Sequence, residues 1–566
     1  MSVRNRNKEL LLVILFFTGM VSAGAQVEFP GKPVGINRQL KAAELMYVLP
    51  PLNPLELEAA IQENSSSTLK PFHFALERTV DLRPESHGSW DMEGNVRIWR
   101  IHILSPEARS MGLVFNTYRL EPGVKVFIYD PDMKQVKGAF TSGNNKVSGI
   151  LPVGHVPGEE LIVEMQVPSG LENYGILRIE SISHAYKDVG QMLKDKPPAG
   201  SFGGADACNI DINCSEGNNW QLTKRSVVRI FTTRQYCTGV LINNTSYDGT
   251  PYILTAEHCL NKQYYADRTV FQFNYESPTC FGPDGPLNMS ISAAELISVG
   301  DSIDFSLVKL SLTPPENFDV YYAGWDRSDF QTTASKTIHH PWGDVKKISS
   351  DYEAPSKPAQ PGDVPYSDLD DYHYYSFWWI RGWDEGSTEG GSSGGPLFNA
   401  GQKVIGTLSG GFARCGDSID YDYEKDRVIY SKALNYDDYY TRMSMSWDYE
   451  EEKGFSLKPW LDPGNTGHEV VDGYEPVGIG PELKVSNTHF TLFPNPVGNE
   501  LHIANVDYLP GPVNYTIYSL SGAPVLSGKL DGVSEPIPTV VLPDGLYVIR
   551  IANSGFMEHL KFIVAR

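Results

Sequence analysis

The sequence predicts an all-β protein that is divided into several domains. With 566 residues the chain is too long for one hydrophobic core, and its 41% hydrophobic and 20% charged residues fit a mostly globular chain. Its apolar segments are short, they alternate with polar residues, and Gly and Pro turns separate them, as is typical of β-strands. All six cysteines lie between residues 208 and 415, which indicates disulfides within one middle domain. We therefore expect roughly three or four domains, most of them rich in strands.

Residues 1–25 have the features of a signal peptide. Arg4, Arg6 and Lys8 form a basic region, a short apolar run follows, and Ala-Gly-Ala ends the segment with small residues that suit cleavage. The alternative is a membrane anchor, but the run is short for a helix that spans a bilayer, and no later segment is longer and equally apolar. We expect export through the periplasm to the medium or the cell surface.

The formal net charge of −22 argues against nucleic acid and anionic membranes as partners. Both carry negative charge, so a strongly acidic chain is repelled by them. The same charge suits a soluble exported protein and favours cationic substrates.

Residues 26–204 form a cysteine-free, β-rich region. Helical signals occur early, around residues 55–61, and alternating runs that are typical of a β-sandwich follow. These runs are residues 96–103, 124–129 and 160–165. Residues 194–204 are rich in Gly, Pro and Lys, so we expect an exposed linker there.

The cysteine-bearing domain is expected over residues 205–473, where short strands and frequent Gly turns favour a β-barrel fold. A linker without periodicity follows at residues 474–485. Residues 486–566 are expected to form a small antiparallel β-sandwich without a catalytic constellation. Its strand-like runs are residues 515–518, 540–542, 547–551 and 561–564.

Three segments of the middle domain carry the residue types of an activated serine. Ser393 lies in a tight glycine turn, where its hydroxyl can project, and His258 follows an apolar run well upstream. Asp304 lies between them in the sequence. A serine hydroxyl is a poor nucleophile at neutral pH, so it needs an adjacent base, and the base needs an orienting partner. We expect His258 to take the proton of Ser393 and Asp304 to hold the imidazole.

The glycine turn also offers backbone donors for an oxyanion. The N–H groups of Gly391 and Ser393 can converge on one point, where they would stabilise a tetrahedral intermediate by several kcal/mol. A Gly-Ser-rich stretch alone is often a flexible loop, and a lone histidine is more often structural than catalytic. The conjunction of the three segments favours a peptidase.

The middle domain resembles the bacterial lysyl endopeptidase family, whose members are chymotrypsin-like serine proteases that use the order His, Asp, Ser. The resemblance covers nearly all of residues 205–473. Its motifs are CNID at 208–211, CTG at 237–239, TAEHC at 255–259, YAGWDR at 322–327, IHHP at 338–341, EGGSSG at 389–394 and WLDP at 460–463. It implies a double β-barrel, the triad His258, Asp304 and Ser393, and cleavage after lysine.

The resemblance also selects one disulfide pairing, which the cysteine spacing alone leaves open. It implies the pairs Cys208–Cys415, Cys214–Cys280 and Cys237–Cys259. We expect neither metal nor cofactor, because the sequence has no CxxC or HExxH spacing. The adjacent His339 and His340 match a family segment outside the catalytic site.

A lysine-specific pocket needs a fixed carboxylate for the substrate ammonium. The family places this aspartate after the last cysteine and before an aromatic-rich strand, and the matching stretch here is residues 417–427. Asp422 is the first choice and Asp420 the second. The alternatives for this stretch are a solvated acidic loop and a calcium-binding loop, because alternating acids can supply oxygen ligands.

Ser409 and Gly411 are expected to offer backbone hydrogen bonds to an extended peptide substrate. The family can carry a histidine at the position of Ser409, where it takes part in the substrate pocket. The resemblance therefore does not extend to the rate or the pH behaviour of the reaction.

The final domain resembles the C-terminal sorting domain of the type IX secretion system. Its motifs are FPNP at 493–496, SLSG at 519–522, LPDGLY at 542–547 and KFIV at 561–564. The alternative is a generic β-sandwich or carbohydrate-binding module. The resemblance implies recognition by the outer-membrane secretion machinery, followed by removal of the domain or its exchange for a surface anchor.

Together these features predict a secreted zymogen that acts on proteins or peptides as a serine endopeptidase cleaving after lysine. Residues 26–204 would be its prodomain, because they precede the mature start of the family's enzymes. We expect the enzyme to cut itself after Lys194 and a second cut between about residues 474 and 486. The alternatives are an endopeptidase of trypsin-like or other specificity and a surface adhesin with an inactive protease fold.

Overall fold

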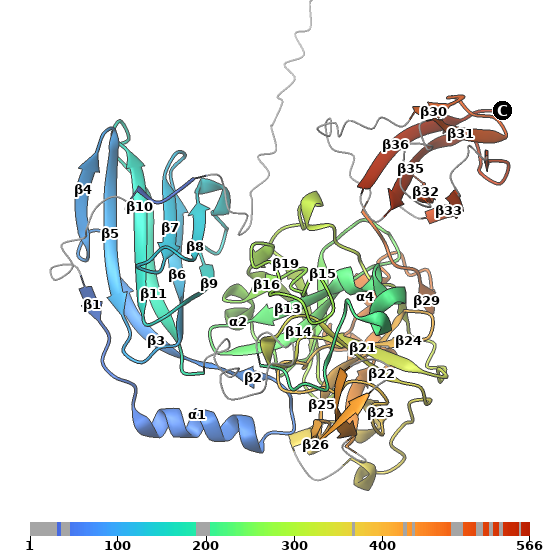
Figure 1. Cartoon of the computed structure of the whole chain (residues 1–566), viewed down its shortest axis with the longest axis horizontal. Helices are drawn as coiled ribbons and strands as arrows, with labels where there is room; N and C mark the ends of the chain where they lie inside the picture. The colour runs from blue at the N-terminus through green and yellow to red at the C-terminus, as the bar shows by residue number, and fades with distance from the viewer. Residues whose placement is uncertain are drawn as a thin grey trace, which may run out of the picture.

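The computed structural model of the chain describes residues 31–34, 46–187, 204–364, 368–422, 427–432, 436–476, 491–504, 513–519, 524–530, 536–553 and 556–566. Strands dominate three successive parts of the chain (Figure 1), which we call the N-terminal part (46–187), the middle part (204–476) and the C-terminal part (491–566). The predicted all-β fold class is confirmed. The expected signal peptide lies outside the described residues.

The N-terminal part contains two sheets that share one core. The six-stranded sheet consists of β1 (Met46–Val48), β4 (Ser89–Glu93), β5 (Val96–Leu104), β7 (Lys125–Tyr129), β8 (Val136–Phe140) and β10 (Glu160–Pro168), and the four-stranded sheet of β3 (Ala75–Leu82), β6 (Ser110–Leu120), β9 (Leu151–Pro157) and β11 (Gly175–Ala185). Trp99, Phe115 and Met165 are buried in the core between them. All three strand-like runs expected here are strands of this sandwich.

A segment between β1 and β3 leaves the sandwich and reaches the middle part. Helix α1 (Pro54–Ser66) begins after Asn53, whose Oδ1 accepts a hydrogen bond of 3.0 Å from the N–H of Leu55. The chain then enters β2 (Phe72–His73), which pairs antiparallel with β14 (Gln235–Ile242) of the middle part. Figure 1 shows α1 below the N-terminal part and to the left of the lower half of the middle part, with β2 beside β14. Residues 67–73 therefore join the two parts across the surface of the second.

The middle part contains two large sheets. Besides β2 and β14, the eight-stranded sheet has β13 (Val227–Phe231), β15 (Tyr252–Thr255), β16 (Val270–Gln272), β17 (Ser290–Ser292), β18 (Ala294–Gly300) and β19 (Phe305–Leu310). The nine-stranded sheet has β12 (Ile210–Asp211), β20 (Trp325–Asp326), β21 (Ser335–His339), β22 (Lys347–Asp351), β23 (Phe377–Ile380), β24 (Pro396–Asn399), β25 (Val404–Gly411), β28 (Asp438–Arg442) and β29 (Val470–Val471). Ile253 and Phe271 lie in the core of the first, and Leu408 and Tyr440 in a core of the second.

Three short helices and one hairpin complete the middle part. The helices are α2 (Gln263–Asp267), α3 (Met443–Trp447) and α4 (Lys458–Leu461). Strands β26 (Cys415–Asp422) and β27 (Arg427–Lys432) pair only with each other, so they form a hairpin outside the nine-stranded sheet.

Three disulfides connect elements of the middle part. The bonds join Cys208 to Cys415, Cys214 to Cys280 and Cys237 to Cys259, which is the pairing that the family resemblance implies. Each closes a loop that the unfolded chain would otherwise sample freely, and such constraints are worth about 2–4 kcal/mol.

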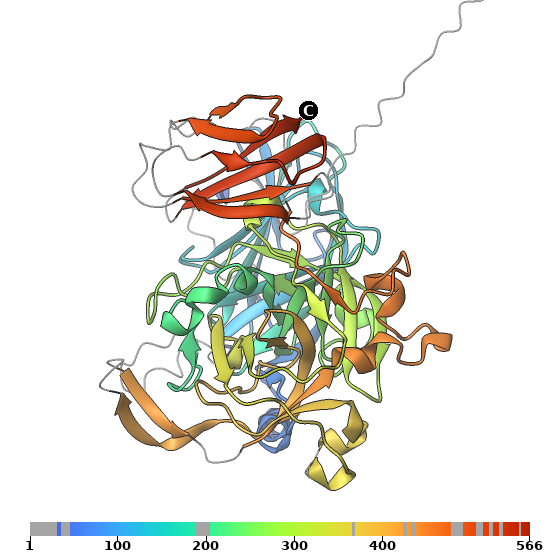
Figure 2. The ribbon, with the colours of Figure 1, turned by 90° about the vertical axis from the view of Figure 1, so that its right-hand side faces the viewer.

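The C-terminal part is a small sandwich, drawn at the top of Figure 2. One sheet has β30 (Thr491–Phe493), β31 (Glu500–Ala504) and β34 (Ile537–Pro538), and the other has β32 (Val513–Tyr518), β33 (Pro524–Leu530), β35 (Gly545–Asn553) and β36 (Phe556–Val564). The strand expected at residues 540–542 is wrong. Val540 and Val541 are exposed in a turn closed by the hydrogen bond from Leu542 N to Thr539 O, at 2.9 Å.

Within the described residues, no helix combines the length and the apolar character needed to cross a bilayer.

Candidate active site

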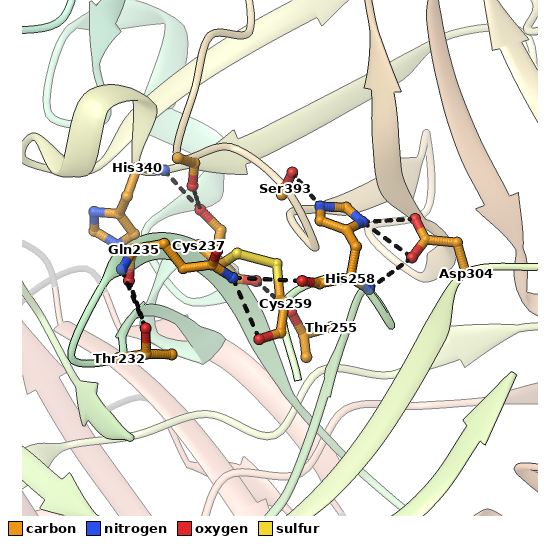
Figure 3. The surroundings of a disulfide bond; sticks show 11 residues. Thr232, Gln235, Cys237, Thr255, His258, Cys259, Asp304, His340 and Ser393 are labelled. Atoms are coloured by element: carbon orange, nitrogen blue, oxygen red, sulfur yellow. Dashed lines mark hydrogen bonds and ion pairs between the residues drawn. A yellow bond between two sulfur atoms is a disulfide. The ribbon is translucent and has the colours of Figure 1, made fainter. Parts of the chain in front are cut away.

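His258, Asp304 and Ser393 meet between the two large sheets of the middle part. His258 follows β15, Asp304 directly precedes β19, and Ser393 lies in the turn before β24. Nε2 of His258 lies 2.7 Å from Oγ of Ser393, and Nδ1 lies 3.0 and 3.1 Å from the two carboxylate oxygens of Asp304 (Figure 3). Each distance is within hydrogen-bond reach, so the three side chains form one hydrogen-bonded relay in which only His258 takes up a proton and Asp304 orients its ring.

Asp304 is fully buried and remains the anionic member of this relay. Burial acts to raise the pKa of its carboxyl, but the charge of His258 and hydrogen bonds from His258 and Ser409 outweigh it, so the pKa lies below its ordinary value. The backbone N–H of His258 also donates to Asp304 Oδ1 at 3.1 Å. An ionised Asp304 with these donors fixes the orientation of the imidazole.

The turn that carries Ser393 needs glycine on both sides. Gly391 has a φ of +95°, and a Cβ there would lie 2.7 Å from the carbonyl oxygen of His340. Gly394 has a φ of +77°, and a Cβ there would lie 2.0 Å from Thr255 Oγ1. Positive φ values and such close approaches exclude side chains at both positions. The glycine pattern in the sequence therefore reports a real backbone constraint next to Ser393.

The disulfide between Cys237 and Cys259 ties the His258 turn to β14 (Figure 3). Gln235, on the same strand, also contacts this turn, since its Nε2 donates to the carbonyl oxygen of His258 at 3.4 Å. On the other side, the N–H of Thr238 donates to the carbonyl oxygen of Ser393 at 2.7 Å. Strand β14 thus holds the segments of His258 and Ser393 at a fixed separation.

The backbone carbonyl of Lys70 occupies the position predicted for an oxyanion. Its oxygen accepts hydrogen bonds from the N–H of Gly391 at 2.6 Å and from the N–H of Ser393 at 3.3 Å. The two amides named from the sequence therefore converge on one oxygen atom next to the Ser393 hydroxyl. This is the arrangement of donors that stabilises charge on a carbonyl oxygen.

The side chain of Lys70 extends from the same point into a buried pocket. Its Nζ lies 2.6 Å from Oδ1 of Asp438 and 3.0 Å from the carbonyl oxygen of Ala413, and it also donates to Oγ1 of Thr388. The side chain of Lys70 is 7% exposed and that of Asp438 is fully buried. Trp383 Nε1 donates to the other carboxylate oxygen of Asp438 at 2.7 Å. The carbonyl oxygen of Thr388 also accepts from Nζ at 3.4 Å, so the pocket compensates a buried ammonium with one carboxylate and three further oxygens.

Asp438, and neither Asp422 nor Asp420, is the acid that contacts Lys70 among the described side chains. Residues 415–422 belong to β26 of the separate hairpin, and the side chains of Asp420 and Asp422 lie outside the described ones. The acid that contacts the lysine follows the hairpin, as the first residue of β28. The sequence held a signal for it, because Asp438 directly precedes Tyr439 and Tyr440 and so meets the expectation of an acid before an aromatic-rich strand. The choice of Asp422 and Asp420 from the sequence stays a prediction, and Asp438 is a further candidate for the acid of the pocket.

The end of β25 contacts the segment that precedes Lys70. The N–H of Gly411 donates to the carbonyl oxygen of Thr68 at 2.9 Å, and Leu69 forms an antiparallel bridge with Gly410. The Ser409 hydroxyl instead contacts Thr441 Oγ1 at 3.0 Å. Of the two expected contact residues, Gly411 meets an extended chain through its backbone and the Ser409 side chain supports the region of Asp304.

His339 and His340 serve the architecture behind the serine turn. His339 is buried between Ser392 Oγ and Ser349 Oγ, at 2.8 and 3.2 Å, and burial lowers its pKa to about 3, so it is neutral at physiological pH. His340 Nδ1 lies 2.9 Å from the carbonyl oxygen of Asp344. The clusters of possible metal ligands among the described residues each include a cysteine that is bonded in a disulfide.

The two sheets, with the three side chains between them, have the arrangement of the chymotrypsin-like fold. Residues 202–425 match the family described as lysyl endopeptidase, C-terminal domain. Residues 491–565 match the secretion system C-terminal sorting domain, which identifies a protein that is secreted or held at the cell surface.

Similar individual proteins include several peptidases. The chain is 26% identical over 302 residues to a lysyl endopeptidase of Pseudomonas aeruginosa, a match that spans 50% of this chain and 62% of that protein. Among solved structures, a Glu endopeptidase is 14% identical, with 42% of this chain and 93% of that chain covered and a TM-score of 0.25. The VesB protease of Vibrio cholerae is 11% identical, with 60% and 95% covered and a TM-score of 0.24.

Proposed function

We propose that this protein is a serine endopeptidase that cleaves peptide bonds after lysine. One observation carries the proposal: Lys70 has its carbonyl oxygen on the amides of Gly391 and Ser393 and its ammonium on Asp438. A residue held at both points presents its carbonyl carbon to the Ser393 hydroxyl. A single lysine residue therefore contacts both the acid of the pocket and the amides beside the nucleophile.

The mechanism follows from the same contacts. Ser393 Oγ attacks the carbonyl carbon of a substrate lysine while His258 Nε2 accepts its proton. The negative charge that develops on the carbonyl oxygen is stabilised by the amides of Gly391 and Ser393. His258 then donates the proton to the departing amine, and a water molecule, activated by His258, hydrolyses the ester between Ser393 and the lysine. Asp304 stabilises the charged imidazole in both steps.

The pocket favours lysine over arginine because of the hydrogen bonds of its carboxylate. Oδ2 of Asp438 already accepts from Trp383 Nε1 and Thr388 Oγ1, which leaves Oδ1 for the substrate. A single ammonium needs one such oxygen, whereas a guanidinium binds best to two parallel oxygens. The carbonyl oxygens of Ala413 and Thr388 and the hydroxyl of Thr388 complete the set of acceptors for an ammonium.

Labelling with a fluorophosphonate and profiling of cleavage sites test this function. The secreted protein should react with the probe, because only an activated serine is labelled, and it should cut a denatured protein mixture after lysine. Cuts after arginine at similar rates would support the trypsin-like alternative. Absence of both labelling and cleavage would support an inactive adhesin.

The domain boundaries proposed from the sequence lead to a prediction about maturation. Residues 26–204 would be a prodomain, 205–473 the peptidase, 474–485 a linker and 486–566 the sorting domain read by the outer-membrane secretion machinery. We expect a self-made cut after Lys194, followed by trimming toward Cys208, because proline after Lys196 disfavours the neighbouring bond. Both lysines lie outside the described residues.

N-terminal sequencing of the secreted form measures this cut. A mature protein that still begins near Gln26 would contradict the prodomain assignment. A Ser393→Ala precursor, purified away from other proteases, should keep residues 26–204 attached. A cut at the same bond in that variant would exclude self-processing.

A further inference from the structure

Residues 67–73, which we call the cleft segment, cross the candidate active site as an extended chain. Before Lys70, Thr68 and Leu69 pair with Gly411 and Gly410 at the end of β25. After it, Phe72 and His73 pair antiparallel with Tyr236 and Gln235 of β14. The cleft segment is therefore bound as an added strand on both sides of the Ser393 hydroxyl, the way a protease binds a peptide.

The side of the cleft segment that follows Lys70 is held by packing as well as by hydrogen bonds. The Phe72 ring lies against Trp342, with centroids 4.6 Å apart, and Phe74 stacks on Tyr236 at 4.3 Å. Phe72 and Phe74 are buried in a cluster that contains Tyr236. Residues beyond the Lys70 carbonyl therefore stay in place, and they would remain next to Ser393 if the bond after Lys70 were opened.

The sandwich of the N-terminal part anchors this arrangement from outside the cleft. Glu180 of β11 forms an ion pair of 2.6 Å with Arg268, and Glu77 of β3 accepts from Thr233 Oγ1 at 3.2 Å. The N–H of Phe74 donates to the carbonyl oxygen of Arg234 at 3.0 Å. These contacts fix β3, and with it the end of the cleft segment, to the eight-stranded sheet that contains β14.

The residue after Lys70 is proline, and this decides the outcome of binding. Hydrolysis at Lys70 would require His258 to protonate the nitrogen of residue 71 as it departs. In Pro71 that nitrogen carries a ring carbon in place of hydrogen, and the ring fixes the backbone at φ near −65°. The proline ring therefore hinders the approach of the His258 imidazole to this nitrogen. It also keeps the backbone from adopting the geometry of an ordinary scissile bond. The cleft segment therefore makes the contacts of a substrate, but its Lys70–Pro71 bond is not one that the triad can hydrolyse.

We propose that the N-terminal part is a lysine-directed peptidase inhibitor in which Lys70 fills the specificity pocket and Pro71 prevents cleavage. The proposal rests on the proposed function, because it assigns the pocket around Asp438 to lysine. It gives the N-terminal part a defined activity: it blocks the active site competitively and stays intact while it does so. Latency of the full chain then depends on two adjacent residues.

Replacing Pro71 by alanine in the full-length chain tests the inference directly. Ser393 Oγ should then form an ester with the Lys70 carbonyl, its proton should pass through His258 Nε2 to the backbone nitrogen of residue 71, and water should release the Lys70 carboxylate. Mass spectrometry of the intact protein should detect two fragments that meet between residues 70 and 71. The wild-type chain should remain uncut there, and so should the double variant Pro71→Ala, Ser393→Ala.

A second variant keeps the inference testable if Pro71→Ala fails to fold. Lys70→Gln removes the ammonium from a buried ion pair, so the inhibitory contact should weaken by about 100-fold or more. The full-length variant, checked as uncut by mass, should hydrolyse a small lysyl substrate much faster than the uncut wild-type chain. Lys134→Gln is the matched control, because Lys134 is 78% exposed and pairs only with the exposed Asp132 among described contacts. It should stay as latent as the wild type.

The outcomes separate this inference from the proposed function. If the mature wild-type enzyme cleaves lysyl substrates but the folded Pro71→Ala chain stays intact after Lys70, the inhibitor inference is overturned. It is also overturned if the wild-type chain is cut at Lys70–Pro71, or if Lys70→Gln leaves latency unchanged. If the mature enzyme does not cleave after lysine at all, the proposed function fails instead.

Discussion

Ser393→Ala is expected to reduce peptidase activity by roughly a millionfold, the loss typical of removing the nucleophile of such a triad. The hydroxyl that lies 2.7 Å from His258 Nε2 disappears, and no other atom of the turn changes. Steady-state hydrolysis of a lysyl peptide measures the effect, with the variant first freed of residues 26–204 by wild-type enzyme that is then removed. The glycine turn and the disulfides should persist, so the melting temperature should stay close to that of the wild type.

His258→Ala should reduce activity nearly as much, and the double variant should be little worse than either single variant. The two residues act as one unit, so the base has no function without the hydroxyl that it deprotonates. Effects that add on a logarithmic scale would contradict this coupling. Normal turnover by Ser393→Ala would overturn the assignment of the nucleophile.

Asp438→Asn is expected to have a large effect outside the triad, and only on lysyl substrates. The change keeps the size of the side chain but removes the negative charge that lies 2.6 Å from the Lys70 ammonium. Loss of one member of a buried charge pair should lower kcat/KM for lysyl substrates by about 100- to 1,000-fold. Slow hydrolysis of substrates with a neutral side chain should be nearly unchanged, because the triad and the oxyanion amides remain.

Asp422→Asn is the matched control for this prediction, since it makes the same chemical change at the acid first chosen from the sequence. It should leave the preference for lysine as it is in the wild-type enzyme. If Asp422→Asn abolishes the preference while Asp438→Asn preserves it, the pocket is formed by the hairpin after all. If neither variant alters it, neither of these two carboxylates decides the specificity.

The catalytic side chains could be predicted because each lies in a short motif with its own local constraint. Gly391 and Gly394 must be glycine for backbone reasons, and His258 adjoins a cysteine whose disulfide fixes its turn. Such constraints act over a few residues, so they remain visible in the sequence. The order of the three motifs and the family resemblance supplied the long-range arrangement that local patterns lack.

Strand prediction succeeded where an apolar run is buried in a core and failed where most of it is exposed. β5 and β10 lie next to each other in the core of the sandwich, and their apolar alternation is clear in the sequence. Residues 540–542 are equally apolar, yet only Leu542 is buried. An apolar run forms a strand only where a neighbouring strand pairs with it and a core buries its side chains.

The sequence alone determined the fold class and the sorting domain, and it predicted the three candidate catalytic residues and the two candidate oxyanion amides, because these depend on local backbone geometry or on recognisable motifs. Only the tertiary structure showed that Asp438 contacts Lys70 and that the Lys70 carbonyl lies on the amides of Gly391 and Ser393. Lys70 and Asp438 are 368 residues apart, and no local pattern in the sequence connects them. Their ion pair forms because packing of the N-terminal part against the middle part places the Lys70 ammonium next to the Asp438 carboxylate. Each buried charge is compensated by the other.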